Sequence, residues 1–137
     1  MKQVNSKVVL NRSIINKLNK EAVIALEMTG EEVLDQIVEA QVIPFGDSYE
    51  RGGKTHRGGT LQESGYVNTK GSSQGHVQIS FNTPYARRLY YHPEYNFRTK
   101  DNPNAKGKWM EDWAEDGKYA SKIKRFYAYQ FKALGGL

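Results

Sequence analysis

The chain has 137 residues, a formal net charge of +5 at pH 7 and no cysteine. A chain of this length is expected to form one domain with its own core, without disulfides or thiol chemistry. The first residues contain no apolar segment of the kind that secretory signals carry, and no window reaches about 18 apolar residues, so we expect neither a signal peptide nor a membrane span. The positive charges are dispersed, which permits contact with nucleic acid or another acidic surface but does not require it.

The first part of the sequence predicts a strand and then a long helix. Val4 to Leu10 is rich in β-branched residues, which favour a strand. From Ser13 to about Gln41 the spacing of apolar residues is that of an amphipathic helix. Thr29 and Glu32 have the spacing of a capping box around Gly30, so we expect the helix to kink or restart there. The apolar positions are Ile15, Leu18, Ala22, Leu26, Val33, Ile37 and Ala40.

Residues 44–59 have a different composition, with five glycines, alternating charges and few apolar residues. This composition predicts a mobile Gly-rich surface loop. Two interpretations stay open, namely a loop that orders on assembly with a partner and a disordered connector. Lys54 and Thr55 follow two glycines, but no glycine stands at the earlier position that a phosphate-binding loop requires.

The remaining elements complete an α+β pattern. Thr60 to Ser64 reads as a helical turn, and Gly65 to Thr69 and His76 to Phe81 read as two strands of a hairpin. A final amphipathic helix is stopped by Gly135 and Gly136. We therefore predict a single domain, residues 1–137, in which a long N-terminal helix and a C-terminal helix pack on a small, mostly antiparallel sheet. The apolar positions of the final helix are Ala120, Ile123, Tyr127, Phe131 and Leu134.

The segment between the hairpin and the last helix carries most of the residue-specific information. Pro84 suits the first position of a short helix, Tyr85 to Tyr90, and Pro93 ends it. A second helix is expected over Ala105 to Glu115, with its two tryptophans four residues apart on one face. Residues 101–104, with the sequence Asp-Asn-Pro-Asn, predict a turn between them.

Aromatic residues and arginines occur together in this segment, and both are enriched at protein contact surfaces. For any single aromatic residue, filling the core is an equally good interpretation. For the run 87–92 as a unit it is a poorer one, because two arginines and a histidine need partners when they are buried. The candidate protein-interface residues are Tyr85, Arg87, Arg88, Tyr90, Tyr91, Tyr95, Trp109 and Trp113.

Candidate catalytic and metal-binding groups do not converge in the sequence. The histidines His56, His76 and His92 have no metal-ligand spacing to one another or to a carboxylate. There is no nucleophile elbow and no cysteine, so we expect no enzyme activity, cofactor, metal or small-molecule substrate. The carboxylates at 111, 112, 115 and 116 predict a solvated acidic face, or one that meets basic residues such as Arg87, Arg88 or Lys122 of a neighbouring copy.

Four short segments together resemble the minor capsid protein family of tailed phages and prophages of Gram-positive bacteria. They are Tyr85-Ala86-Arg87, Tyr95-Asn96-Phe97, Asn102-Pro103-Asn104-Ala105 and the pair Trp109 and Trp113. Upstream, Gly59-Thr60-Leu61 is a looser match to a signature of the related tail-completion proteins, and this departure leaves the strand order of the sheet open. The resemblance spans residues 11–117.

This resemblance implies a structural virion protein of the head–tail connection that helps to join capsid and tail. It implies a ring of copies around the DNA channel, with neighbouring connector or tail proteins as further partners, and it allows non-specific contact with phage DNA. The expected location is the head–tail junction of the virion, and the host cytoplasm before assembly. The isolated protein is compatible with a monomer that assembles only in the virion.

Two other functions remain as alternatives. In a small nucleic-acid-binding protein, the run Arg87-Arg88-Leu89-Tyr90-Tyr91 would stack bases and hold phosphates. No known nucleic-acid-binding motif accompanies that run. A host-directed or toxin-like enzyme would need a cluster of polar groups in a pocket, which the sequence does not indicate.

Overall fold

The computed structural model describes residues 4–9, 20–46, 49–51, 54–56 and 58–135. It has the predicted α+β composition, with helices and antiparallel strands in one chain. The elements, among which η denotes a short 3-10 helix, are β1 (Val4–Val9), α1 (Lys20–Glu39), β2 (Tyr49–Arg51), β3 (Lys54–His56), α2 (Thr60–Glu63), β4 (Gly65–Asn68), η1 (Ser72–Gln74), β5 (His76–Phe81), α3 (Ala86–Tyr90), η2 (Glu111–Trp113) and α4 (Ala120–Ala133).

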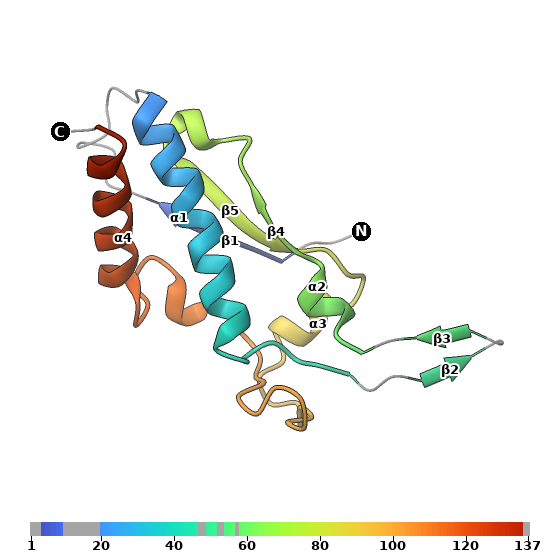
Figure 1. The fold of residues 1–137 in the computed structure, drawn as a ribbon. Helices are drawn as coiled ribbons and strands as arrows, with labels where there is room; N and C mark the ends of the chain where they lie inside the picture. Colours follow the sequence, from blue (N-terminus) through green and yellow to red (C-terminus); the bar gives the residue numbers. More distant parts are fainter. Residues whose placement is uncertain (1–3, 10–19, 47–48, 52–53, 57, 136–137) are drawn as a thin grey trace.

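The main sheet has three strands in the order β1-β5-β4, and both pairings are antiparallel. Helix α1 lies across one face of this sheet, and α4 lies alongside α1 (Figure 1). Strands β2 and β3 form a separate hairpin that projects away from the body of the molecule (Figure 1). The predicted β4–β5 hairpin and the predicted N-terminal strand are both confirmed.

The core lies between the sheet and α1. In β5, Val77, Ile79 and Phe81 alternate with more polar residues and are almost completely buried. Their partners on α1 include Leu26, Val33 and Ile37, which recur at helical spacing and are also buried. The period of two in the strand and the period between three and four in the helix therefore both follow from burial of a single face.

Helix α1 is continuous from Lys20 to Glu39, so the predicted restart at Gly30 is wrong. The Thr29 hydroxyl donates a hydrogen bond to the Ala25 carbonyl oxygen (2.7 Å), so it bonds within the helix and does not cap a new one. A Cβ atom on Gly30 would lie 2.9 Å from Cγ1 of Val67 and 3.0 Å from Cγ2 of Val77. Glycine therefore allows the helix to approach the sheet closely. The predicted start of the helix at Ser13 lies outside the described residues.

The region predicted as a loop without regular structure, 44–59, contains the strands β2 and β3. They pair antiparallel over three residues each. In the sequence they flank Gly52-Gly53, a dipeptide that favours tight hairpin turns. Residues 47–48, 52–53 and 57 lie outside the described residues.

The predicted helix over Ala105 to Glu115 is also wrong, because its backbone groups bond elsewhere. The N–H of Lys106 donates to the Val42 carbonyl oxygen (3.0 Å) and that of Lys108 to the Tyr90 carbonyl oxygen (2.8 Å). Lys108 also has a φ of 47°, which an α-helix does not allow. Only η2 forms within this range. The segment is held as an irregular strap across the end of α1.

Candidate protein-contact surface

Helix α3 follows the turn at Thr83 and Pro84 and presents its arginines to solvent. Ala86 is fully buried and Leu89 packs partly against the core, so one side of this short helix is fixed to the body. The opposite side carries Arg87 and Arg88, which are both exposed. Alternation of apolar and basic residues within one helical turn therefore orients both guanidinium groups outward.

Each of the two arginines lies over a tyrosine ring. The guanidinium carbon of Arg87 is 5.9 Å from the centroid of the Tyr91 ring, and that of Arg88 is 5.8 Å from the centroid of the Tyr95 ring. Arg88 Nε also donates a hydrogen bond to the Tyr95 hydroxyl oxygen (3.2 Å), and this contact raises the pKa of Arg88. Such cation–π pairs hold two long side chains in defined positions.

The same tyrosine belongs to a small polar cluster. The rings of Tyr95 and His92 stack with centroids 4.7 Å apart and planes 9° from parallel. His92 Nδ1 is 2.7 Å from the Glu94 carboxylate, and this hydrogen bond lowers the pKa of Glu94. The chain after Pro93 has no regular secondary structure, and these side-chain contacts hold it in position.

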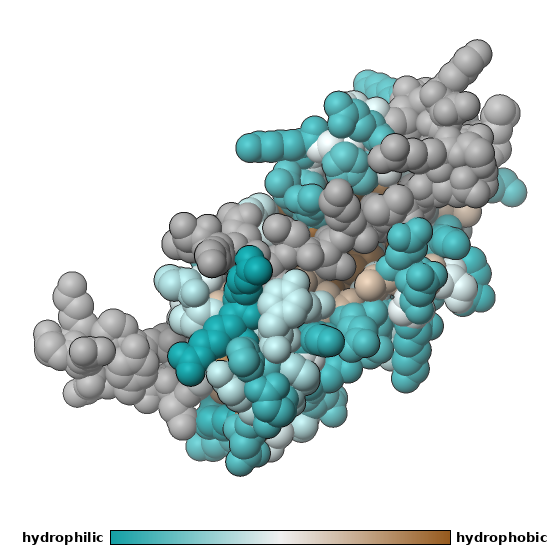
Figure 2. All heavy atoms as spheres, turned by 180° about the vertical axis from the view of Figure 1, so that it is seen from behind, coloured by the Kyte–Doolittle hydropathy of each residue, from teal (hydrophilic) through white to brown (hydrophobic). Residues whose placement is uncertain are grey.

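Seven of the eight candidate residues therefore separate into two groups, and the eighth, Tyr90, lies between them. Tyr85 and Tyr91 are 43% and 55% exposed, and they lie with the two arginines and the partly exposed Tyr95 around α3. We define the α3 patch as Tyr85, Arg87, Arg88, Tyr91 and Tyr95. In Figure 2 the part of the surface where α3 and the following segment lie is coloured teal to white almost throughout, and hydrophobic brown is visible mainly at the centre of the molecule.

The two tryptophans do not belong to this surface. Trp109 is fully buried and Trp113 is 5% exposed, so both are core residues and their prediction as interface residues is wrong for this chain. The Trp109 ring meets Phe81 and Tyr90 in edge-to-face contacts, with centroid distances of 5.6 and 4.8 Å. The Trp113 indole N–H donates to the side-chain oxygen of Gln36 on α1 (3.1 Å). The strap thus uses its tryptophans to close the end of the core.

Tyr90 connects the two groups. Its ring packs against Trp109 on one side and contacts Tyr91 edge-to-face on the other, with centroids 5.1 Å apart. Burial is the main cause that raises the pKa of Tyr90 to about 12. Tyr90 is therefore a support for the α3 patch and only a minor part of its exposed surface.

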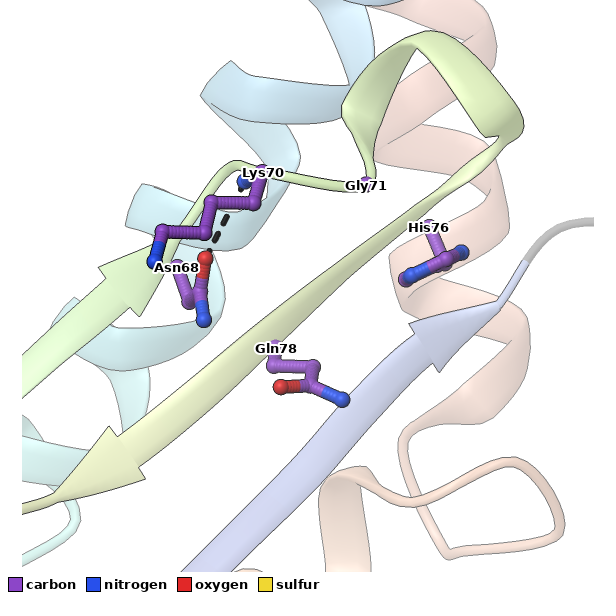
Figure 3. Close-up of a pocket in the computed structure, with 5 residues that line it drawn as sticks. All are labelled: Asn68, Lys70, Gly71, His76 and Gln78. Atoms are coloured by element: carbon purple, nitrogen blue, oxygen red, sulfur yellow. Dashed lines mark hydrogen bonds between the residues drawn. The ribbon is translucent and has the colours of Figure 1, made fainter.

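A shallow polar pocket of about 70 Å³ lies on the sheet face that is turned away from α1 (Figure 3). It is lined by Asn68, Lys70, Gly71, His76 and Gln78. The His76 ring occupies the space that a side chain on Gly71 would need, since a Cβ there would lie 2.1 Å from Nε2. These five residues include no carboxylate, hydroxyl or thiol, and His76 and Lys70 are the side chains among them that can gain or lose a proton.

Two other kinds of site, a metal centre and a membrane-spanning helix, are not formed by the described residues. No group of three or more histidine, cysteine or carboxylate side chains within the described ranges is arranged to hold a metal ion. In the same part of the chain, no helix combines the length and the apolar character needed to cross a membrane. Comparison with protein-family models, with curated proteins and with solved structures gave no significant match.

Tyr129 is 70% exposed on α4 and is a further surface residue that was not among the eight candidates predicted from the sequence. The apolar positions of α4 are Ile123, Tyr127 and Phe131, which recur every fourth residue, and Tyr129 falls outside this series. Its position outside the apolar stripe of an amphipathic helix was the sequence signal that could have identified it as an exposed aromatic residue.

Proposed function

We propose that this chain is a structural assembly protein of a tailed phage or prophage, which acts at the head–tail connection and joins capsid and tail through protein–protein contacts. Copies of the chain would form a ring around the DNA channel. The proposal is supported by the resemblance of residues 85–113 to minor capsid proteins. The observation that carries it is the α3 patch, in which tyrosines and arginines are exposed together.

The geometry of the α3 patch suits protein binding for two reasons. Tyrosine and arginine bury large areas and still form directed polar contacts, which is why they dominate binding energy at many interfaces. In addition, Arg87 and Arg88 are already held over Tyr91 and Tyr95. Side chains that are ordered before binding lose less conformational entropy when a partner docks.

The direct test is to remove the protein from the phage or prophage that encodes it. If it joins head to tail, electron micrographs will show DNA-filled heads and complete tails that remain separate, and the wild-type gene will restore joined virions. Equal numbers of joined virions with and without the protein would overturn the proposal.

A patch variant then tests the surface itself. We expect the double substitution Arg88→Ala and Tyr91→Ala to lower the yield of joined virions at least tenfold, because it removes two anchors of the α3 patch. The control is Lys100→Ala with Thr99→Ala, which removes the same charge from exposed residues nearby. Both variants should unfold within a few degrees of wild type, and full assembly with the patch variant would show that the contact lies elsewhere.

Nucleic-acid binding is the second candidate, because exposed arginines over tyrosine rings can also contact phosphates and stack on bases. In that case the purified protein would bind a DNA duplex tightly at ~50 mM salt and much more weakly at ~200 mM salt. The Arg88→Ala and Tyr91→Ala variant would lose this binding, and the Lys100→Ala control would keep most of it.

A further inference from the structure

Helix α1 carries a line of carboxylates on its solvent side. Glu31, Asp35 and Glu39 are all exposed, and they follow one another at intervals of four residues. This interval places successive carboxylates about 6 Å apart along one side of the helix, over roughly 12 Å in all. Met28, which is 39% exposed, continues the same line toward the start of the helix. We call these four residues the acidic stripe.

Helix α4 carries a basic line of similar length. Lys122, Arg125, Tyr129 and Lys132 are exposed, and at 3.6 residues per turn they fall within an arc of about 80° and extend over about 15 Å. The range from Ala120 to Ala133 contains no aspartate or glutamate. We call these four residues the basic stripe. Each stripe thus combines three like charges with one exposed Met or Tyr side chain.

The charges of the two stripes are not neutralised within the described part of the chain. The ion pairs described there include those of His92 with Glu94, Arg98 with Asp101, and Lys106 with Asp112. None of them includes a residue of either stripe, and the one described contact of a basic-stripe cation is that of Lys122 with the Tyr119 ring (5.9 Å). Like charges one helical turn apart repel each other, so an isolated copy gains nothing from either arrangement.

The relative position of the stripes indicates which partner fits them. Because α1 and α4 lie side by side, each molecule presents an acidic and a basic line on neighbouring helices (Figure 1). DNA bound along α4 would come close to the carboxylates of α1 and be repelled by them. A second copy of the chain, in contrast, offers a basic line for the acidic one and an acidic line for the basic one.

We infer that copies of this chain associate by docking the basic stripe of one molecule on the acidic stripe of another, with Tyr129 as the aromatic anchor of the contact. The inference rests on the proposed assembly function and names the contact between copies. The charge pairing itself is argued from residues of α1 and α4 alone. Tyr129 supplies the buried area and the charged residues fix the register.

Charge reversal followed by mixing gives the sharpest test. One variant carries Arg125→Glu with Lys132→Glu, so both of its stripes are negative, and the other carries Glu31→Lys with Asp35→Lys, so both are positive. Each variant alone should associate at least tenfold more weakly than wild type, measured by light scattering after size-exclusion chromatography over a range of concentrations. An equal mixture of the two should recover association, because opposite stripes then meet again.

Matched controls separate this contact from net charge. Each single substitution changes the net charge by two units, and each variant carries two substitutions. The net charge therefore falls from +5 to +1 in the first variant and rises to +9 in the second. The same totals result from Lys118→Glu with Lys124→Glu and from Glu115→Lys with Asp116→Lys, which alter exposed residues outside the stripes. These controls should associate as wild type does. Wild-type association should weaken between ~50 and ~300 mM salt, because screening acts on exposed charges.

The outcomes distinguish this inference from the proposed function. A mixture that recovers association supports the stripe contact. A wild-type protein that stays monomeric at high concentration overturns it, and so do oligomers that both reversal variants form as well as wild type. In either case the test with separate heads and tails still decides the proposed function. Salt-sensitive DNA binding that is lost only in the Arg125→Glu and Lys132→Glu variant would assign the basic stripe to nucleic acid and also overturn the inference.

Discussion

Replacing Gly30 with alanine tests whether this glycine serves close packing or a break in the helix. The added Cβ would lie 2.9 Å from Cγ1 of Val67 and 3.0 Å from Cγ2 of Val77. Ordinary carbon contacts are about 3.5–4.0 Å long, so the helix and the sheet would have to separate by roughly 0.5–1 Å or the two valines would have to turn. Overpacking of this kind costs ~1–3 kcal/mol.

Helix propensity acts in the opposite direction. Alanine is favoured over glycine inside a helix by about 1 kcal/mol. The expected net change for Gly30→Ala is therefore a loss of about 1 kcal/mol in the free energy of unfolding, or roughly 3 °C in Tm for a chain of this size. Urea unfolding monitored by circular dichroism measures the free energy, and thermal unfolding measures the Tm.

A double-mutant cycle with Val67→Ala makes the test specific. Val67→Ala removes the nearer of the two methyl groups, so Gly30→Ala should cost less in that background, with a coupling of at least ~0.5 kcal/mol. Asp35→Ala, at an exposed position of the same helix, is the control and should show no coupling to Val67. If Gly30→Ala stabilises the wild-type protein by the full propensity difference and shows no coupling, the close-packing argument fails.

Two further predictions concern Tyr90 and Asn102. The pKa of Tyr90 is raised to about 12 in the folded protein against an ordinary value of 10. Its contribution is therefore fully present below pH 10 and is lost as the pH rises toward 12, since the unfolded chain releases the proton first. Urea unfolding at about pH 9 and about pH 11 gives the free energy of unfolding at each pH. Between these two values it should fall less for Tyr90→Phe than for wild type, because phenylalanine has no proton to release. Asn102 is buried and its side-chain N–H groups donate to the Ile43 carbonyl oxygen (2.7 Å) and to Gln62 (2.9 Å). Asn102→Ala should lower the free energy of unfolding by ~1–3 kcal/mol by leaving a buried carbonyl unpaired, whereas exposed Asn96→Ala should change it by less than about 0.5 kcal/mol.

The regular elements were predictable because each has a strong local signal. Period-two alternation in residues 76–81 and helical spacing in the last helix both arise from burial of one face, and both elements formed as expected. Gly30 shows where such signals fail. A glycine after a threonine has the same sequence pattern whether it interrupts a helix or lies against a sheet, and only the distances to Val67 and Val77 separate the two cases.

The strap after α3 could not be predicted from local patterns, because its bonds are long-range. Its backbone donors reach Gln41, Val42 and Tyr90 instead of residues one helical turn away. The side chain of Asn102 likewise bonds to Ile43. The spacing of four residues between the two tryptophans therefore does not reflect a helix. The backbone of this segment bonds instead to residues about sixty positions earlier or on another element.

The aromatic residues of this strap and of α3 differ in how deeply they are buried. Trp109 fills the space between Phe81 and Tyr90, and Tyr90 in turn contacts Tyr91 at the surface. A continuous series of rings thus runs from the sheet to the α3 patch, so the orientation of the exposed residues depends on the buried ones. The core tryptophans contribute to the proposed contact by holding α3 in place, and the exposed tyrosines and arginines are the groups that a partner would touch. This division explains how one short segment can close the core of the domain and at the same time present the proposed contact surface.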